Sequence, residues 1–199
     1  MNFTGPKIKK SRALGVALTP KAEKYMKKRP YGPGQHGQRR RRRPSDYGVQ
    51  LLEKQRLRFQ YNISERQLQR AFEMASRKSG PTGEILIQLL ETRLDAVVLR
   101  AGLAPSVFAA RQFVTHGHIL LNGKKADIPS MRIKVGDVIT IKERSKTLVM
   151  FQEGRVPVNV PGYLSFDDGT LTAKLLSAPP RDEIPVICNE QLVVEYYSR

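Results

Sequence analysis

The residues best suited to chemistry in this sequence are arginines, and the chemistry they offer is phosphate binding. Five consecutive arginines close the stretch RPYGPGQHGQRRRRR, which begins at Arg29. A guanidinium group is always charged and donates paired hydrogen bonds, so such a run suits a crowded phosphate backbone. Glycines let backbone N–H groups approach an anion, and Tyr31 and His36 can stack on bases. The candidate contacts here are Arg29, Tyr31, Gln35, His36, Arg39, Arg40, Arg41, Arg42 and Arg43.

Two other interpretations of the arginine run compete with this one. Clustered basic residues also form nuclear-localisation signals, and a charged tail can remain solvated without any partner. The run is embedded, however, in further basic and stacking residues, which neither alternative requires. Phosphate binding is therefore the favoured interpretation.

Further cations follow along the chain in two groups. Lys54, Arg56 and Arg58 lie on a predicted helix and would add phosphate contacts. Between residues 93 and 142 a predicted helix ends beside a predicted hairpin, an arrangement suited to RNA, whose duplexes are recognised largely by shape. The candidates there are Arg93, Arg111, Gln112, His116, His118, Lys124, Lys125 and Arg132. For the two histidines, capping of the helix end is an equally open alternative.

The net charge of the chain indicates the kind of partner it meets. The 199 residues include 35 Lys and Arg against 18 Asp and Glu, a net charge of +17. This net charge is +14 in residues 1–60, zero in 61–92, +6 in 93–150 and −3 in 151–199. Such an excess destabilises a compact state unless a polyanion neutralises it, which points to nucleic acid or an anionic membrane surface. We expect the acidic C-terminal segment to face solvent or a basic neighbouring protein.

Several classes of protein are disfavoured by composition. No apolar run approaches the ~20 residues of a transmembrane helix, and the first residues lack the apolar core of a signal peptide. Cys188 is the only cysteine, so we expect neither an internal disulfide nor a multi-cysteine zinc site. Asp167-Asp168-Gly169 is more typical of a turn than of a metal loop. Motifs of nucleotide-binding or hydrolytic enzymes are absent from the sequence, which predicts no catalytic activity and no small-molecule substrate.

Apolar spacing and capping residues predict the elements that must position these side chains. Residues 1–44 show almost no apolar periodicity and many Gly and Pro residues, so we expect an arm that is ordered only against its partner. Helix starts are predicted at Ser45, at Ser64 with Gln67 as a capping box, at Thr82 and at Ser106. Gly102 and Gly117 are predicted to end two helices.

After Gly117 the apolar pattern changes to a period of two. Asn122-Gly123 between apolar and basic residues is a strong hairpin signal. Strands are predicted at 131–135 and 137–142, with weaker ones at 156–160 and 192–197. The last of these can equally close onto the helical part of the chain.

Several of these segments resemble a known family. The segment from Arg93 to Ile141, RLDAVVLRAGLAPSVFAARQFVTHGHILLNGKKADIPSMRIKVGDVITI, resembles the small RNA-binding domain shared by ribosomal protein four of the small subunit and several RNA-modifying enzymes. Flanking segments resemble the ribosomal protein itself, namely RPYGPGQHGQ, RPSDYGVQLLEKQRLRFQYNISERQ and NEQLVVEYYSR. The catalytic domains of the enzymes would need long additional sequence.

The resemblance implies an α+β fold: a mainly helical domain with an inserted small α/β RNA-binding module (α-L type) and a basic extended N-terminal arm. The expected parts are the arm at 1–44, the helical domain at 45–92, the module at 93–153 and a C-terminal segment at 154–199 packing on the helical domain. Some relatives hold zinc with four cysteines in the arm. Here the stretch from Lys7 to Tyr31 has none, so we expect no zinc and no cofactor, with the arm held by RNA.

The resemblance also implies a function. Such a protein is a structural constituent of the small ribosomal subunit that binds its rRNA early, nucleates assembly of the subunit body and affects translational accuracy. The implied partners are small-subunit rRNA, neighbouring small-subunit proteins and mRNA at the entry channel, with no membrane. The implied location is the ribosome of a bacterial cytoplasm, or of a plastid. An RNA chaperone or stress factor that uses the same module outside the ribosome is the alternative.

Overall fold

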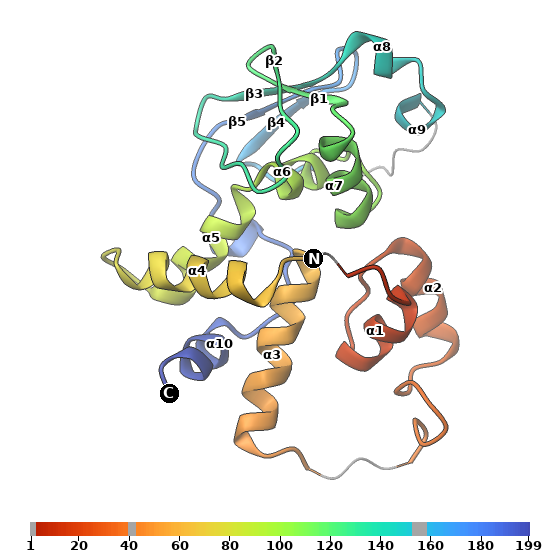
Figure 1. The fold of residues 1–199 in the computed structure, drawn as a ribbon, viewed down its shortest axis with the longest axis vertical. Coiled ribbons are helices and arrows are strands. Elements are labelled where there is room, and N and C mark those ends of the chain that lie inside the picture. Colours follow the sequence, from red (N-terminus) through yellow and green to blue (C-terminus); the bar gives the residue numbers. More distant parts are fainter. Residues whose placement is uncertain (1–2, 40–42, 153–158) are drawn as a thin grey trace. The chain divides into compact units, whose positions relative to one another are not determined.

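The computed structural model describes residues 3–39, 43–152 and 159–199, which fold into two compact units (Figure 1). The first unit comprises residues 1–86 and 186–199, and the second comprises 87–185. The chain therefore leaves the first unit within one helix and returns to it for its last 14 residues. Helices together with one antiparallel sheet confirm the predicted α+β class.

The first unit is entirely helical within the described residues. Its helices are α1 (Lys7–Leu14), α2 (Pro20–Lys28), α3 (Asp46–Gln60), α4 (Glu65–Ser76), the first half of α5 (Thr82–Glu91) and α10 (Glu190–Tyr197). The predicted caps are confirmed at Ser45, which accepts a hydrogen bond from Gly48 N, and at Ser64, which forms the predicted capping box with Gln67. These caps satisfy N–H groups that a helix start leaves without partners.

The expectation of an extended arm over 1–44 is wrong, because this segment contains α1 and α2. Thr19 caps α2, and Pro20 occupies its first turn, where a missing N–H costs nothing. Leu14, Val16 and Leu18 are buried between the two helices. The apolar residues therefore lie mainly in the connection and not along either helix, which is why helical periodicity did not reveal them.

The C-terminal residues also differ from the sequence expectation, since the predicted strand at 192–197 lies within helix α10. Asn189 caps this helix by accepting hydrogen bonds from Gln191 N and Leu192 N. Tyr197 stacks on Phe72 of α4 with ring centroids 4.9 Å apart. Over six residues an apolar alternation does not distinguish a strand from a helix. The cap at Asn189 was the signal that could have decided the matter.

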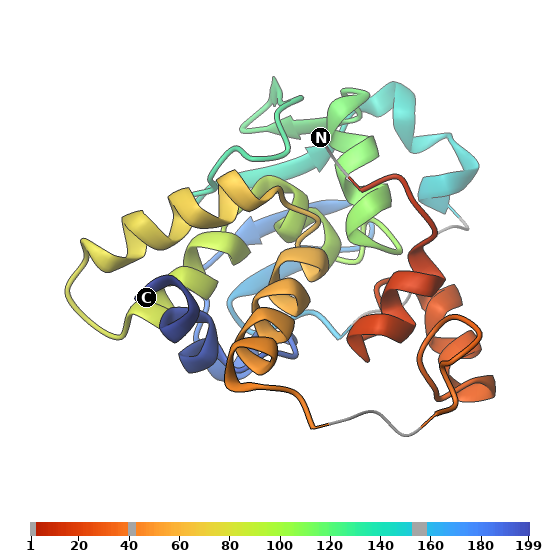
Figure 2. The same cartoon turned by 60° about the horizontal axis from the view of Figure 1, so that its bottom comes forward.

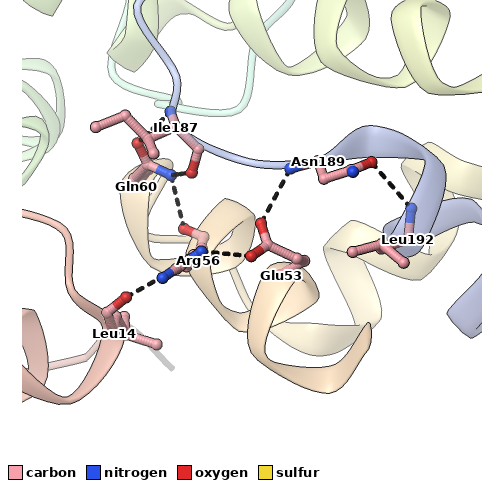
Figure 3. A network of polar contacts seen from close by, with 7 residues as sticks. All are labelled: Leu14, Glu53, Arg56, Gln60, Ile187, Asn189 and Leu192. Atoms are coloured by element: carbon pink, nitrogen blue, oxygen red, sulfur yellow. Dashed lines mark hydrogen bonds and ion pairs between the residues drawn. The ribbon is translucent and has the colours of Figure 1, made fainter. Parts of the chain in front are cut away.

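A polar network joins the C-terminal segment to α3 (Figure 3). Gln60 exchanges two hydrogen bonds with the backbone of Ile187, at 2.9 and 3.0 Å. Asn189 N donates to Oε2 of Glu53 at 2.9 Å, and the other oxygen of Glu53 pairs with Arg56. Arg56 in turn donates to the Leu14 carbonyl at 2.8 Å. Helix α3 thus connects the two ends of the first unit.

The second unit contains the sheet and the helices beside it (Figure 2). Its strands are β1 (Ile119–Leu121), β2 (Lys124–Lys125), β3 (Val138–Ile141), β4 (Leu164–Asp167) and β5 (Thr172–Leu175), in the antiparallel order β2-β1-β3-β5-β4. The helical elements are the end of α5, α6 (Leu94–Arg100), α7 (Val107–Thr115), α8 (Glu143–Lys146), α9 (Val149–Gln152) and the 3₁₀ turn Arg181–Glu183. Ser106 caps α7, as predicted.

The hairpin predicted at Asn122-Gly123 is confirmed. Both residues have positive φ, 49° and 78°, as the tight two-residue turn between β1 and β2 requires. The strand predicted at 131–135 is wrong, because this stretch makes only the isolated bridge between Arg93 and Arg132. Of the strand predicted at 156–160, residues 156–158 lie outside the described part, and 159–160 are not in a strand.

The expected domain division is corrected after residue 153. The β4–β5 hairpin pairs with β3 and extends the same sheet, while only residues 186–199 join the helical unit. Strands of four residues give little periodicity, so the sequence did not reveal them. The turn predicted at Asp167 is confirmed, since Asp167 accepts hydrogen bonds from Gly169 N and Thr170 Oγ1 at its start.

A buried charge cluster ties the start of β4 to the helices of the second unit. Tyr163 and Glu91 are almost fully buried, and the Tyr163 hydroxyl donates to Oε1 of Glu91 at 2.8 Å. Arg100 pairs with the same carboxylate. Burial, with the nearby Glu91 charge, raises the pKa of Tyr163, so its hydroxyl remains a donor. A buried carboxylate that accepts hydrogen bonds from two donors is stable. When one donor is removed, part of the cost of taking the carboxylate out of water is no longer offset by a hydrogen bond.

We predict that Tyr163→Phe destabilises the protein by about 1–3 kcal/mol, because Glu91 stays buried with one donor fewer. Urea unfolding followed by circular dichroism measures this change. Ser165→Ala, at an exposed position of the same strand, is the matched control and should shift the midpoint little. Equal midpoints for Tyr163→Phe and the unaltered chain would show that the cluster does not hold β4.

Candidate nucleic-acid interface

The first candidate surface lies in the segment between α2 and α3. Five of its predicted contacts are exposed, namely Arg29, Gln35, His36, Arg39 and Arg43. Arg40, Arg41 and Arg42 lie outside the described residues. Exposed cations and stacking groups close together in the chain can contact a phosphate backbone. We call this segment, residues 29–43, the arm surface.

Glycines make the arm surface compact. Gly34 has a positive φ of 91°, and Gly37 N donates to the Gly34 carbonyl at 3.1 Å. A Cβ atom on Gly37 would lie 1.9 Å from the carbonyl oxygen of Gly32, so only glycine fits at this position. The GPGQHG stretch is therefore a tight turn with a specified shape.

Arg12 anchors this turn to α1, and sequence reasoning did not identify it. Its Nε donates to the Tyr31 carbonyl at 3.1 Å, and its Nη2 donates to the Gly32 carbonyl at 3.0 Å. The guanidinium carbon lies 4.9 Å from the centroid of the Tyr31 ring, which is half-buried. The arm is thus also held within the protein, and its contact with RNA stays a prediction. No pattern marked Arg12, because it follows three lysines in the same short helix.

The three candidate cations of α3 contact protein carboxylates. Lys54 is buried, lies 2.8 Å from Oε1 of Glu65 and sits over the Tyr196 ring. Burial alone would raise the pKa of Glu65, but hydrogen bonds from Lys54 and Tyr197 outweigh it and lower that pKa. Arg58 also approaches Glu65, at 3.4 Å.

Lys54 therefore belongs to the scaffold, and its prediction as a phosphate contact is corrected. A buried ammonium with a carboxylate partner has no surface to offer a phosphate. Arg56 and Arg58 are partly exposed, with about a quarter of each side chain accessible, 27% and 25%. Both keep some surface for an additional anion.

The second candidate surface is formed by the end of α7 and the β1–β2 hairpin. Gln112, His116, Lys124 and Lys125 are exposed there, and Arg132 is exposed in the segment that follows the hairpin. Lys125 lies 3.2 Å from Asp127, a pair that water screens because both side chains are about half exposed. We call this set the module surface. All of these residues were predicted from the sequence as one RNA-binding group, and all lie in the second unit.

Arg93 and Arg111 share Asp95 as an ion-pair partner. Arg93 forms a two-point ion pair with this buried carboxylate, at 2.9 and 2.7 Å, and Arg111 lies 3.4 Å from it. Burial lowers the pKa of Arg111, an effect that Asp95 opposes. Arg93 is nearly inaccessible, so it is corrected from an RNA contact to a scaffold residue.

The two histidines of the motif HGH play different parts. His116 is exposed and terminates α7, which fits the capping alternative. His118 lies 2.9 Å from Ser145 Oγ and packs edge-on against Phe113 and Phe151. Burial, with electrostatic interactions with the nearby His116 and Lys142, lowers the pKa of His118. His118 is therefore neutral near pH 7 and supports the helix end from within.

Among the described residues, no cluster of three or more His, Cys, Asp or Glu side chains could hold a metal ion. In the same part of the chain, no helix is long and apolar enough to cross a membrane.

Comparison with known proteins agrees with the division into a helical and a sheet-containing part. The family model described as ribosomal protein S4/S9 N-terminal domain matches residues 2–91, and the S4 domain model matches residues 92–139. A protein of Micrococcus luteus is 56% identical over 198 residues, covering 96% of this chain and 95% of its own. A protein of Streptomyces avermitilis is 55% identical, covering 100% and 99%. One of Thermobifida fusca is 50% identical over the full length of both chains.

These matches define the class as S4-domain proteins that also carry the S4/S9 N-terminal domain. All three relatives are named small ribosomal subunit protein uS4. The chain belongs to this uS4 family.

We predict that the double substitution Lys124→Glu and Lys125→Glu weakens binding to small-subunit rRNA and lowers the salt slope of binding by about 2, one for each lost phosphate contact. Fluorescence titration at graded salt measures both. The fold should persist, because both side chains are exposed. Arg77→Glu with Lys78→Glu, an adjacent exposed pair at the end of α4, is the matched control. Equal losses in the two double variants would contradict the assignment of the module surface.

Proposed function

We propose that this protein is a structural constituent of the small ribosomal subunit that binds small-subunit rRNA through the arm surface and the module surface. The observation that carries the proposal is the distribution of paired and exposed cations. Glu53, Glu65, Glu91 and Asp95 neutralise the inner cations, while the two surfaces keep theirs exposed. The full-length similarity to proteins named small ribosomal subunit protein uS4 supports it.

Two surfaces on two folded units suit a folded RNA with more than one helix. Phosphate contacts supply affinity with little sequence preference, and the shape of the RNA supplies the selection. If both surfaces engage one molecule, the second contact benefits from a high effective concentration. Binding of this kind orders a multi-helix junction, which supports an early role in assembly of the subunit body. We propose further effects on accuracy and contact with mRNA on the basis of family resemblance alone.

The proposed role is binding and not catalysis. Two groups with shifted pKa values serve the scaffold: Tyr163, whose pKa is raised, donates to a buried carboxylate, and His118, whose pKa is lowered, supports a helix end. The proposed location is the ribosome of the bacterial cytoplasm, because the relatives come from bacteria.

The acidic C-terminal part has a separate proposed role. Asp167, Asp168, Asp182 and Glu183 are exposed, and phosphate would repel them. We propose that this side faces solvent or a basic neighbouring protein of the subunit. These side chains lie on the β4–β5 turn and the following 3₁₀ turn, far in sequence from both candidate surfaces.

Competition binding tests the proposal. The full chain is titrated with the 5′ part of small-subunit rRNA in the presence of an unrelated structured RNA of equal length, at several salt concentrations. We expect a preference for the rRNA that persists as salt weakens both complexes, because shape selection survives screening better than phosphate attraction. Equal affinities would overturn the proposal. Stoichiometric presence in purified small subunits during ordinary growth separates it from a chaperone working outside the ribosome.

A further inference from the structure

A cavity of about 350 Å³ lies within the first unit, between α1, α3 and the start of the arm surface. Its lining includes Arg12, Arg56, Leu52, Pro30 and Gly37. Two guanidinium groups and apolar side chains thus share one depression. Its volume falls in the range of about 300–1,000 Å³ that is typical of small-ligand sites.

Arg12 presents one amino group that its protein contacts do not use. Nε and Nη2 donate to the carbonyls of Tyr31 and Gly32, and the ring of Tyr31 stacks on the guanidinium. Nη1 has no acceptor among the residues that the structure describes. These contacts orient the guanidinium plane, so the remaining donor has a specified direction before any ligand arrives.

The guanidinium group of Arg56, also in the lining, is held by its own protein contacts (Figure 3). Its Nε donates to the Leu14 carbonyl, and its Nη1 pairs with Glu53. Its Nη2 lies beside Gly15, 3.4 Å from where a Cβ would stand, and has no acceptor in the described parts of the chain. Glu53 uses its second oxygen on Asn189 N. Both oxygens of Glu53 thus have partners, and no carboxylate is among the contacts of Arg12 with the described residues.

The walls of the cavity are formed before binding. Gly37 is pressed against Gly32, which fixes the turn that carries the Arg12 acceptors. Gly15 has a positive φ of 70° and no side chain to obstruct Arg56. Preformed donors lose little entropy when a ligand binds.

We propose that this cavity binds one unstacked nucleotide of RNA, with its phosphate between Arg12 and Arg56 and its base against Leu52 and Pro30. Guanidinium donors match phosphate oxygens, and bases in loops and junctions of RNA are free to leave the stack. The apolar wall distinguishes a nucleotide from a bare anion, which would need only the two cations. The inference rests on the proposed rRNA binding and adds a specific subsite to it.

Two substitutions test the subsite in the full chain. Ala13→Leu places a larger side chain in the lining of the cavity without changing the net charge. Leucine favours helices, so α1 should be retained. Arg12→Lys keeps the positive charge but removes the planar guanidinium group with its paired hydrogen-bond donors. The matched controls are Ala17→Leu and Arg70→Lys, both at exposed positions outside the lining. Circular dichroism and urea unfolding verify that each variant is folded.

The readout is dimethyl sulfate footprinting of the 5′ part of small-subunit rRNA, together with the dissociation constant. We expect the unaltered chain to protect one or two unpaired nucleotides that become reactive with Ala13→Leu and with Arg12→Lys, while the rest of the footprint persists. The affinity should fall about tenfold, which corresponds to about 1.4 kcal/mol. Neither control variant should make these nucleotides reactive to dimethyl sulfate.

An unaltered footprint and affinity in both cavity variants would overturn the subsite, and so would a uniform loss of the whole footprint in variants that remain folded. If one variant does not fold, the other decides by the same criteria. Failure of the proposed function appears differently, as an unaltered chain that does not prefer the rRNA over the unrelated RNA.

Discussion

Positive charge is the constraint on which the rest of this structure depends. A net charge of +17 on 199 residues opposes folding through self-repulsion. The fold meets this constraint by placing carboxylates beside the cations that must be buried: Glu65 beside Lys54, and Asp95 beside Arg93. A buried cation without such a partner would cost several kcal/mol. The remaining positive charge stays at the surface, where a polyanion can neutralise it.

The separation of paired, buried cations from exposed ones depends on helix α3 in the first unit and on the sheet and its neighbouring helices in the second. In the first, Glu53 and Arg56 of α3 connect the C-terminal segment to the end of α1, and Arg12 holds the turn of the arm surface. In the second, His118 and Asp95 support the helix and hairpin that display the module surface. The polar side chains that stabilise the scaffold thereby orient the turn and the hairpin that bear the exposed cations.

Local signals predicted much of this fold. The caps at Ser45, Ser64 and Ser106 and the Asn122-Gly123 turn are short-range features, and all are confirmed. Long-range pairing was not predictable in the same way. The β4–β5 hairpin joins β3 although 22 residues of chain, 142–163, separate them, and neither strand is long enough to show a period.

The sequence predicted which residue types form the candidate site, but it did not predict which of these residues are exposed to solvent. Exposed cations such as Lys124 and Arg39 stand in turns, where the sequence already indicates surface positions. Lys54 and Arg93 have the same residue types but lie opposite carboxylates that only the fold brings near. Arg12 was missed because its acceptors are backbone carbonyls about 20 residues away, which leave no trace in a side-chain pattern.

The salt dependence of rRNA binding by the full chain tests this separation of charges most directly. If the exposed cations of both surfaces meet six to ten phosphates, the slope of log affinity against log salt should be about −5 to −9. A slope near zero between 50 and 200 mM salt would contradict the account, because it would mean that the surface cations do not neutralise a polyanion.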